Sequence, residues 1–322
     1  MEKKYKHLVK PLLVKRGPEE LYDEPRFWME SKDLEGFNIH FSYGFIKKPC
    51  LCHPVENEAL VHPYDEVLVF APSDPADDIL DLGAEVSIGI GEEGETHFFD
   101  ESTAVVIPKG MPHGPIEVRR LNKPIAHYLV GLGPEYRAEA VAKKPAARSM
   151  VLKYIRLIKK FRMARMVVSR KLGRTLETTV RPPTGAVLPA GRPFAGPSNA
   201  DQIAWFYNEN LEGLELNVSW GFYSRPGIGH RIGRGGMHKH PVEEILIWVG
   251  LDPENLNFLG CEMEVSFGEE EERHVFNKPA AVLVPKNVVH CPFICRWVDK
   301  PYGFIVLCLG GEHETTWFPP EE

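Results

Sequence analysis

Two stretches lying 177 residues apart determine the fold class. Residues 259–301 read LGCEMEVSFGEEEERHVFNKPAAVLVPKNVVHCPFICRWVDKP, and residues 82–124 read LGAEVSIGIGEEGETHFFDESTAVVIPKGMPHGPIEVRRLNKP. They align without a gap, and 18 of the 43 pairs are identical. The same spacing aligns FWMESKDLEGFNIHFSYGF (27–45) with AWFYNENLEGLELNVSWGF (204–222). Agreement over so long a stretch indicates a tandem duplication, so both halves should fold alike.

Each copy is a series of short apolar runs. Examples are EEILIWV (243–249), EMEVSF (262–267) and AAVLVP (280–285), rich in β-branched and aromatic residues and bounded by turn-forming residues. The chain also contains 28 glycines and 28 prolines, which favours many strands joined by turns over long helices. The sequence therefore predicts an all-β chain with a sandwich or barrel in each half.

The composition is that of an ordinary globular protein. The chain has 322 residues, 43% hydrophobic and 26% charged, which suggests about two domains. A net charge of −7 provides no basic field for nucleic acid or an anionic membrane. The start, MEKKYKHLVK, lacks the apolar core of a secretory signal, so we expect a cytoplasmic protein. The six cysteines fit neither a disulfide scaffold nor a zinc site, so we expect mostly buried free thiols.

The segment between the copies differs from both. Residues 149–174 carry many basic side chains and apolar residues at helical spacing, which predicts a basic amphipathic helix packed on a barrel. The alternative is a membrane-surface or nucleic-acid element. Residues 181–200 are rich in proline and glycine and predict an irregular connector. The predicted parts are an N-terminal segment (1–34), a first barrel (35–148), a linker with the basic helix (149–200) and a second barrel (201–322).

One group of polar residues in the second copy has the spacing of a metal site. In GGMHKHPVEE (235–244), which leads into a strand, His238, His240 and Glu244 fall on one face because strand side chains alternate. Further on, VPKNVVH (284–290) supplies a turn and then His290 at the start of another strand. Three imidazoles and one carboxylate form a donor set for a divalent first-row metal.

These residues resemble those of a known superfamily. H-x-H-x3-E (238–244) followed by P-x-[GN]-x2-H (285–290) is similar to the two motifs of the cupins, and two copies resemble a bicupin. The resemblance covers 35–133 and 212–310 but not the linker. It implies two tandem double-stranded β-helix (jelly-roll) barrels, with His238, His240, Glu244 and His290 as metal ligands. Asn287 departs from the turn glycine, and Ile294 from the asparagine usual after the last histidine.

The first copy lacks part of this pattern. It keeps His62, Glu66 and His113, but Leu60 occupies the position of His238. Loss of one imidazole should weaken metal binding, so we expect a degenerate site whose polar residues hydrogen-bond one another. A loop residue, His53, is a candidate substitute ligand.

The predicted site suits a metal-dependent enzyme. A divalent Mn, Fe, Zn or Ni ion would polarise a small carbonyl or carboxylate substrate, such as a 1,3-dicarbonyl, for hydrolysis, decarboxylation or isomerisation. One alternative is an Fe(II) dioxygenase acting on a catechol-like or diketone substrate. Another is a non-catalytic cupin that binds a small ligand. The oxidisable Met237 and Cys291 lie next to ligands in the sequence, which favours chemistry without O2.

Other residues are candidates for catalysis beside Glu244. Arg225 and Arg231 lie near the first motif and are suited to clamp a carboxylate in a bidentate manner. His274 matches His97 of the first copy and either lines the cavity or fills the core. The expected partners are a small-molecule substrate and further copies of this chain in a homodimer or larger homo-oligomer, with no nucleic acid or membrane.

Overall fold

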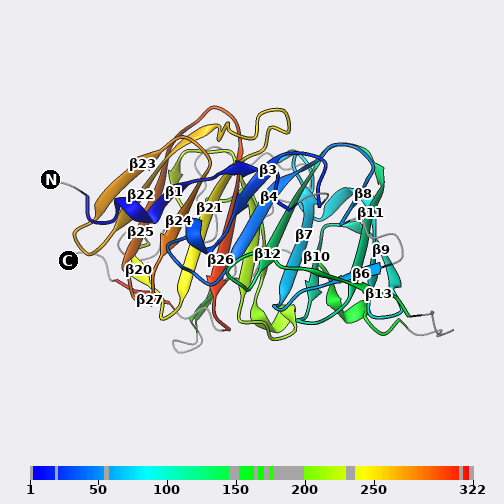
Figure 1. Ribbon diagram of the computed structural model, residues 1–322. Coiled ribbons are helices and arrows are strands. Elements are labelled where there is room, and N and C mark those ends of the chain that lie inside the picture. Colours follow the sequence, from blue (N-terminus) through cyan, green and yellow to red (C-terminus); the bar gives the residue numbers. More distant parts are fainter. Residues whose placement is uncertain are drawn as a thin grey trace. The chain divides into compact units, whose positions relative to one another are not determined.

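In the computed structural model of the chain, the regular secondary structure consists almost entirely of strands (Figure 1). It describes residues 3–18, 21–53, 58–144, 152–162, 166–169, 174–176, 199–229, 236–311 and 315–318. The chain forms two compact units. The N-terminal unit is Leu12–Phe161, and the C-terminal unit combines Met1–Pro11 with Arg162–Glu322. The predicted all-β fold class is confirmed.

The N-terminal unit contains two antiparallel sheets. One has the order β14-β10-β7-β12-β4-β3-β2, and the other the order β13-β6-β11-β8-β9, with β5 also paired to β11. The first sheet comprises β2 (Val14–Lys15), β3 (Arg26–Met29), β4 (His40–Ile46), β7 (Glu66–Pro72), β10 (Thr103–Ile107), β12 (Ile125–Gly131) and β14 (Ile158–Lys160). The second comprises β5 (Cys50–Cys52), β6 (Glu58–Val61), β8 (Asp81–Ile90), β9 (Glu95–Glu101), β11 (His113–Leu121) and β13 (Glu139–Ala142).

The C-terminal unit repeats this arrangement. Its sheets have the orders β1-β24-β21-β26-β18-β17 and β23-β22-β25-β20-β27, with β19 also paired to β25. The first comprises β1 (Val9–Pro11), β17 (Gln202–Phe206), β18 (Asn217–Tyr223), β21 (Glu243–Gly250), β24 (Ala280–Val284) and β26 (Tyr302–Leu309). The second comprises β19 (Gly227–Ile228), β20 (His238–Lys239), β22 (Cys261–Phe267), β23 (Glu272–Phe276), β25 (His290–Val298) and β27 (Thr316–Trp317).

The two units share strand order as well as sequence. Strands β24-β21-β26-β18-β17 follow one another as β10-β7-β12-β4-β3 do, so the duplication extends to topology. The central strands are apolar and buried along their length, as in Val67–Ala71 and Ile245–Val249. Such strands form the apolar core of each unit.

Each unit gains an edge strand from a separate segment of the chain. The segment before the N-terminal unit adds to the C-terminal unit, and the segment between the two repeats adds to the N-terminal unit. The 3-10 helix η1 (Lys6–Leu8) and β1 add to β24 of the C-terminal unit. In the same way η3 (Ile155–Leu157) and β14 add to β10 of the N-terminal unit. The two segments are called here the first arm (3–11) and the second arm (152–161). The segment 1–34 is thus divided, because β2 and β3 belong to the N-terminal sheet.

The prediction of a basic helix in the linker was wrong. Where the structure describes the linker, it contains η3, β14 and a small hairpin of β15 (Met166–Ser169) and β16 (Arg174–Leu176). Leu152 and Ile155, which the helix would have buried, are 49% and 53% exposed, whereas Leu157 is buried. Pairing with the open edge of β10 supplies backbone hydrogen bonds that outweigh the local helical pattern. Most of the predicted connector (181–200) lies outside the described residues.

The other general expectations concern cysteines and membrane spans. All six cysteines are free thiols, and five of them are buried, as predicted. Within the part of the chain that the structure describes, no helix has the length and apolar character needed to cross a membrane. Two further 3-10 helices among the described residues are η2 (Ser31–Asp33) and η4 (Asn208–Leu211).

Candidate metal centre

The structure brings together the four predicted ligands of the C-terminal unit. One ligand atom from each of His238, His240, Glu244 and His290 lies within 4.8 Å of the others, and all four residues are buried. The backbone pairing of β20 with β25 places His238 opposite His290, which is how two distant motifs meet. Glu244 comes from the other sheet, on β21. The cluster therefore lies inside the barrel, between its two sheets.

Hydrogen bonds at Nδ1, the ring nitrogen that faces away from the cluster, orient the three imidazoles. Nδ1–H of His238 donates to the carbonyl of Gly236, and Nδ1–H of His290 donates to the carbonyl of Val288 at 3.2 Å. Nδ1 of His240 hydrogen-bonds Oγ1 of Thr315 at 3.4 Å. Such partners fix the tautomer and leave Nε2 for the centre of the cluster. Nε2 of His240 and of His290 indeed lie 3.6 and 3.1 Å from Oε2 of Glu244.

The turn before His290 explains how this strand enters the cluster. Asn287 has φ 62°, and its counterpart Gly110 has φ 76°, so the turn requires the left-handed region that Gly and Asn tolerate. The amide of Asn287 donates to the carbonyl of His240 at 2.7 Å. The amide of Gly110 donates to the carbonyl of His62 at 3.0 Å. One backbone bond thus ties the two motifs together in each barrel.

The four groups fit a divalent first-row metal. A carboxylate at 3% exposure is costly to bury unless a cation or hydrogen bonds compensate it, and here three imidazoles surround it. The nearby thiols of Cys291 and Cys308 are not among the converging ligand atoms. The donor set is therefore three nitrogens and one oxygen, which suits such ions.

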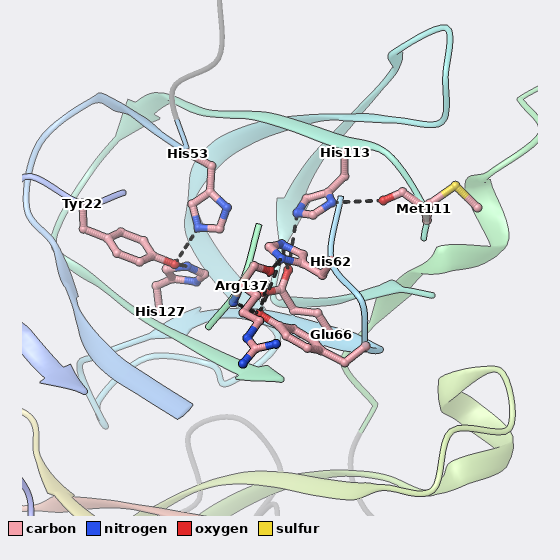
Figure 2. A network of polar contacts seen from close by, with 9 residues as sticks. Tyr22, His53, His62, Glu66, Met111, His113, His127 and Arg137 are labelled. Carbon is pink, nitrogen blue, oxygen red and sulfur yellow. Dashed lines mark hydrogen bonds and ion pairs between the residues drawn. The ribbon is translucent and has the colours of Figure 1, made fainter. Parts of the chain in front are cut away.

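The N-terminal unit holds a smaller cluster of the same type. Figure 2 shows His62, Glu66 and His113 directed at one another, and their ligand atoms lie within 4.8 Å. Oε2 of Glu66 is 3.6 Å from Nε2 of His62 and 3.4 Å from Nε2 of His113. Leu60 lies opposite His113, as His238 lies opposite His290, so the predicted replacement of one imidazole is seen in the structure.

This smaller cluster is not closed by its own hydrogen bonds. Among the described residues, the two carboxylate oxygens of Glu66 have no hydrogen-bond partner of normal geometry. The same is true of Nε2 of His62 and Nε2 of His113. The outer nitrogens are engaged, since Nδ1–H of His62 donates to the carbonyl of Arg137 at 2.6 Å and that of His113 to Met111 at 3.3 Å (Figure 2). The cluster therefore keeps the orientation of ligands, and the degenerate site stays a prediction.

Electrostatics keep Glu66 ionised. Burial opposes its ionisation, but the attraction of His62 and His113 outweighs burial and lowers the pKa of Glu66 to about 2. Burial also lowers the pKa of His62. A buried carboxylate that stays anionic at neutral pH favours an approaching cation.

His53 does not replace the missing imidazole. It is buried, and its ring lies 6.3 Å from that of His113, outside the group of converging ligand atoms. Its Nε2–H donates to the hydroxyl oxygen of Tyr22 at 2.9 Å (Figure 2). That hydroxyl donates to Nε2 of His127 at 2.9 Å, since Nδ1–H of His127 is used on the carbonyl of Val69. His53 thus belongs to a separate network.

Two predicted catalytic residues lie elsewhere. Arg225 forms an ion pair with Asp201, Nη2 to Oδ1 at 2.9 Å, and its side chain is 49% exposed. Nε2 of His274 hydrogen-bonds Oε1 of Glu272 at 2.8 Å on β23. Both side chains contact partners outside the ligand cluster, and their catalytic roles stay predictions. Arg231 lies outside the described residues.

The hydrogen-bond partner of His274, Glu272, is a carboxylate with a structural contact that the sequence did not predict. Glu272 accepts the backbone amides of Lys4 and Tyr5, both at 2.9 Å, and so holds the first arm. The N-terminal unit repeats this with Glu95, which accepts the amides of the second arm at Lys153 and Tyr154, both at 3.0 Å. His97 lies 2.8 Å from Glu95. The signal was available, because E-x-H recurs at matched places in both copies.

Comparison with known proteins identifies the fold. No family model and no curated protein matches the chain. An oxalate decarboxylase studied for its substrate binding mode and the chemical basis of a reaction specificity switch has a TM-score of 0.55 at 12% identity, covering 96% of this chain and 78% of its own. A tryptophan-to-phenylalanine variant of oxalate decarboxylase from B. subtilis gives the same values. A glutamate-to-alanine variant from Bacillus subtilis gives 0.52 at 14% identity, covering 95% and 77%.

These likenesses confirm the two tandem barrels. Because they extend over nearly the whole chain, they cover both units together with their order in the sequence. At such low identity they establish the fold alone. The architecture of two tandem β-barrels that the sequence predicts is therefore the architecture of this chain.

Proposed function

We propose that this chain is a metal-dependent bicupin enzyme whose working site is the four-residue cluster of the C-terminal unit. The observation that supports this most directly is the convergence of His238, His240, Glu244 and His290 within 4.8 Å inside a barrel. The resident cofactor is one divalent Mn, Fe, Zn or Ni ion. The substrate is a small molecule with a carboxylate or carbonyl group.

The protein groups have distinct tasks in this proposal. The three imidazoles bind through Nε2 because their Nδ1 atoms are held by outer partners, which keeps each ring in one orientation. The carboxylate of Glu244 reduces the net charge of the site. A bound divalent metal supplies Lewis-acid polarisation of the substrate's oxygen. The four ligand residues themselves are at most 3% exposed, so bulk water has little access to them.

Decarboxylation is the reaction we favour among hydrolysis, decarboxylation and isomerisation. The solved structures with a similar fold include enzymes named oxalate decarboxylases, which act on a small dicarboxylate. The buried thiols and thioether near the ligands also favour chemistry without O2, since Met237, Cys291 and Cys308 are oxidisable groups. Cys308 lies directly opposite Glu244 in the sheet register.

A substrate screen tests the proposal. Protein purified without air is analysed for metal and then offered small mono- and dicarboxylates and 1,3-dicarbonyls, with CO2 release measured in the presence and absence of O2. We expect metal-dependent CO2 release that does not consume O2. Stoichiometric O2 consumption would replace the proposal with a dioxygenase. Tight binding of a carboxylate without any turnover would replace it with a ligand-binding cupin.

A further inference from the structure

A pair of cysteines lies outside both histidine clusters, on β5 of the N-terminal unit. Cys50 and Cys52 are two residues apart on this strand, so their side chains share a face, and their Sγ atoms lie 3.6 Å apart. Cys52 is 3% exposed, whereas Cys50 is only half-buried. One thiol is therefore open to a small reagent and the other lies behind it.

The fold does not require this pair. The repeat aligns Cys50 and Cys52 with Gly227 and Gly229 of the C-terminal unit, where β19 pairs with β25 as β5 pairs with β11. A Cβ at Gly229 would lie 1.6 Å from the ring of Phe293. The N-terminal unit has Ile116 at the position of Phe293, which leaves room for a thiol. The two sulfurs are thus a property of one barrel only.

A buried cation lies beside the thiols. Both cysteines line a small cavity of about 20 Å³ together with Arg26, Lys47 and Lys48. Arg26 is 2% exposed, and its guanidinium lies 3.7 Å over the ring of Tyr22. It donates to the carbonyl of His127 at 2.7 Å. Its Nε has no hydrogen-bond partner and no carboxylate pairs with it among the described residues. A buried cation without a counter-charge is costly, and Arg26 acts on the nearer thiol, because its charge lowers the pKa of Cys52 against the larger effect of burial.

The pKa values of the two thiols shift in opposite directions. The hydrogen bond with Cys52 lowers the pKa of Cys50, against the opposing effect of burial. The same bond, and then burial, raises the pKa of Cys52. The exposed sulfur is thus the better thiolate and the buried one keeps its proton. This is the division of roles between an attacking and a resolving cysteine.

We propose that Cys50 and Cys52 form a redox-active dithiol that exchanges with a small anionic disulfide of the glutathione disulfide type. The Cys50 thiolate attacks one sulfur of that disulfide, a mixed disulfide forms, and the first thiolate leaves. Cys52 then attacks Sγ of Cys50, releases its proton to water, and displaces the second thiolate. The dithiol loses two electrons and two protons, and the reagent gains them as two thiols, which leaves an intrachain Cys50–Cys52 disulfide.

The charge around the cavity favours an anionic reagent. Arg26, Lys47 and Lys48 line it with three positive charges, against the two negative charges of Asp23 and Glu24. Lys47 lies 4.0 Å from Glu24 and Lys48 lies 3.9 Å from Asp23. The remaining positive charge is that of Arg26. The carboxylates of glutathione disulfide are therefore attracted to the same face that presents Cys50.

The product disulfide should be easy to reduce. Residues two apart on a strand are separated by roughly 6.6 Å between Cα atoms, near the upper end of the range that disulfides span. Closing the bond therefore requires β5 to shorten, and strained disulfides have more oxidising potentials. The pair is suited to reversible exchange rather than to permanent cross-linking.

Intact and peptide mass spectrometry test the proposal. Full-length protein is equilibrated with glutathione at graded oxidised-to-reduced ratios and then alkylated. We expect the wild type to lose two hydrogens within the peptide carrying both cysteines. Cys52→Ser and Cys52→Ala should each accumulate one glutathione on Cys50, and Cys50→Ser should acquire none. Cys261 and Cys295 serve as an internal control, because they are 1% and 2% exposed and should not react in the folded protein.

A second arm of the experiment tests the charge argument. The rate of oxidation by glutathione disulfide is compared with that by cystamine, a cationic disulfide, in the wild type and in Lys48→Gln. We expect the preference for the anionic reagent to fall a few-fold in the variant, whose exposed side chain can change without loss of fold. The proposal is overturned if the Cys52 variants form no mixed disulfide, or if Cys50→Ser is oxidised as readily as the wild type. An unchanged or cationic preference would overturn the assignment of an anionic reagent.

Discussion

The two barrels differ at one position in an otherwise matched cluster. Each has a glutamate from one sheet and a final histidine whose Nδ1 donates to the carbonyl two residues earlier, at 3.3 Å for His113 and 3.2 Å for His290. Opposite that histidine the C-terminal unit has His238, whereas the N-terminal unit has Leu60. The scaffold therefore orients three ligands whether or not the fourth is present.

This comparison shows that the ligand geometry is set by the backbone. The turn with positive φ and its amide bond to the carbonyl of the preceding motif are kept in both units. Evolution could change one ligand without disturbing the other three, because each imidazole is held by its own outer partner. The metal affinity of each barrel should then depend mainly on the number of ligands.

The largest effect is expected for His238→Ala. Removal of one direct ligand should reduce metal affinity of the C-terminal cluster by more than the roughly 10- to 100-fold loss that changes in outer partners cause. Turnover should fall with it. Metal content by mass spectrometry and CO2 release provide the measurements, with Leu60→Ala at the matched N-terminal position as the control. Full metal retention in His238→Ala would contradict the assignment of His238 as a metal ligand.

The reverse change should create the missing ligand. Leu60→His places an imidazole opposite His113 and completes three nitrogens and one carboxylate in the N-terminal unit. We expect the number of metal ions bound per chain at a fixed free metal concentration to rise, with the C-terminal site unchanged. Isothermal titration with Mn²⁺ measures the stoichiometry. If a folded variant binds no additional metal, ligand number is not what separates the two barrels.

The arms provide a smaller, pH-dependent comparison. Burial opposes ionisation of Glu272, but the amides of Tyr5 and Lys4 outweigh it, so the pKa of Glu272 lies below its usual value. A carboxyl whose pKa is lower in the folded state stabilises the fold above its unfolded pKa, about 4.3, and loses this effect as the pH falls. We expect Glu272→Gln to lower Tm at pH 7 and to change it less at acidic pH.

The matched variant Glu95→Gln should behave in the same way, because the amides of Tyr154 and Lys153 also lower the pKa of Glu95 against the effect of burial. Hydrogen exchange at the amides of Tyr5 and Tyr154 reports the release of each arm separately. A Tm difference from the wild type that grows as the pH falls would contradict the proposed carboxylate–amide contacts.

The smallest effect is expected for Arg225→Gln. The Arg225 side of its ion pair with Asp201 is about half-exposed, so loss of the pair should change the free energy of unfolding by only about 1 kcal/mol. Turnover should stay within a factor of about two, which corresponds to less than 1 kcal/mol. Chemical denaturation and steady-state kinetics measure the two quantities. A tenfold loss of turnover would restore Arg225 to the catalytic site and lengthen the list of differences between the barrels.

The features that could be predicted from the sequence are those with local or repeated signals. The 177-residue repeat and the strand periodicity indicated two β-barrels, and the strand-face spacing of His238, His240 and Glu244 placed them together. The turn at Asn287 was also predicted, because few residue types tolerate its φ.

The features that could not be predicted depend on contacts far apart in the sequence. Nothing local in residues 152–161 indicates that their partner is the edge of β10, so the apolar spacing suggested a helix. His274 was expected to line the cavity or to fill the core, whereas it hydrogen-bonds Glu272 two residues earlier. Glu272 in turn holds the first arm, whose position cannot be read from the residues around His274.

The placement of the first arm has a consequence for proteolysis. A protease that nicks the chain within 163–198 would produce one fragment ending beyond the second arm and another starting before β17. The N-terminal fragment would still carry residues 3–11. Its β1 is hydrogen-bonded to β24, which belongs to the C-terminal fragment. The pieces should therefore co-purify until a denaturant extracts that strand, even though no peptide bond joins them.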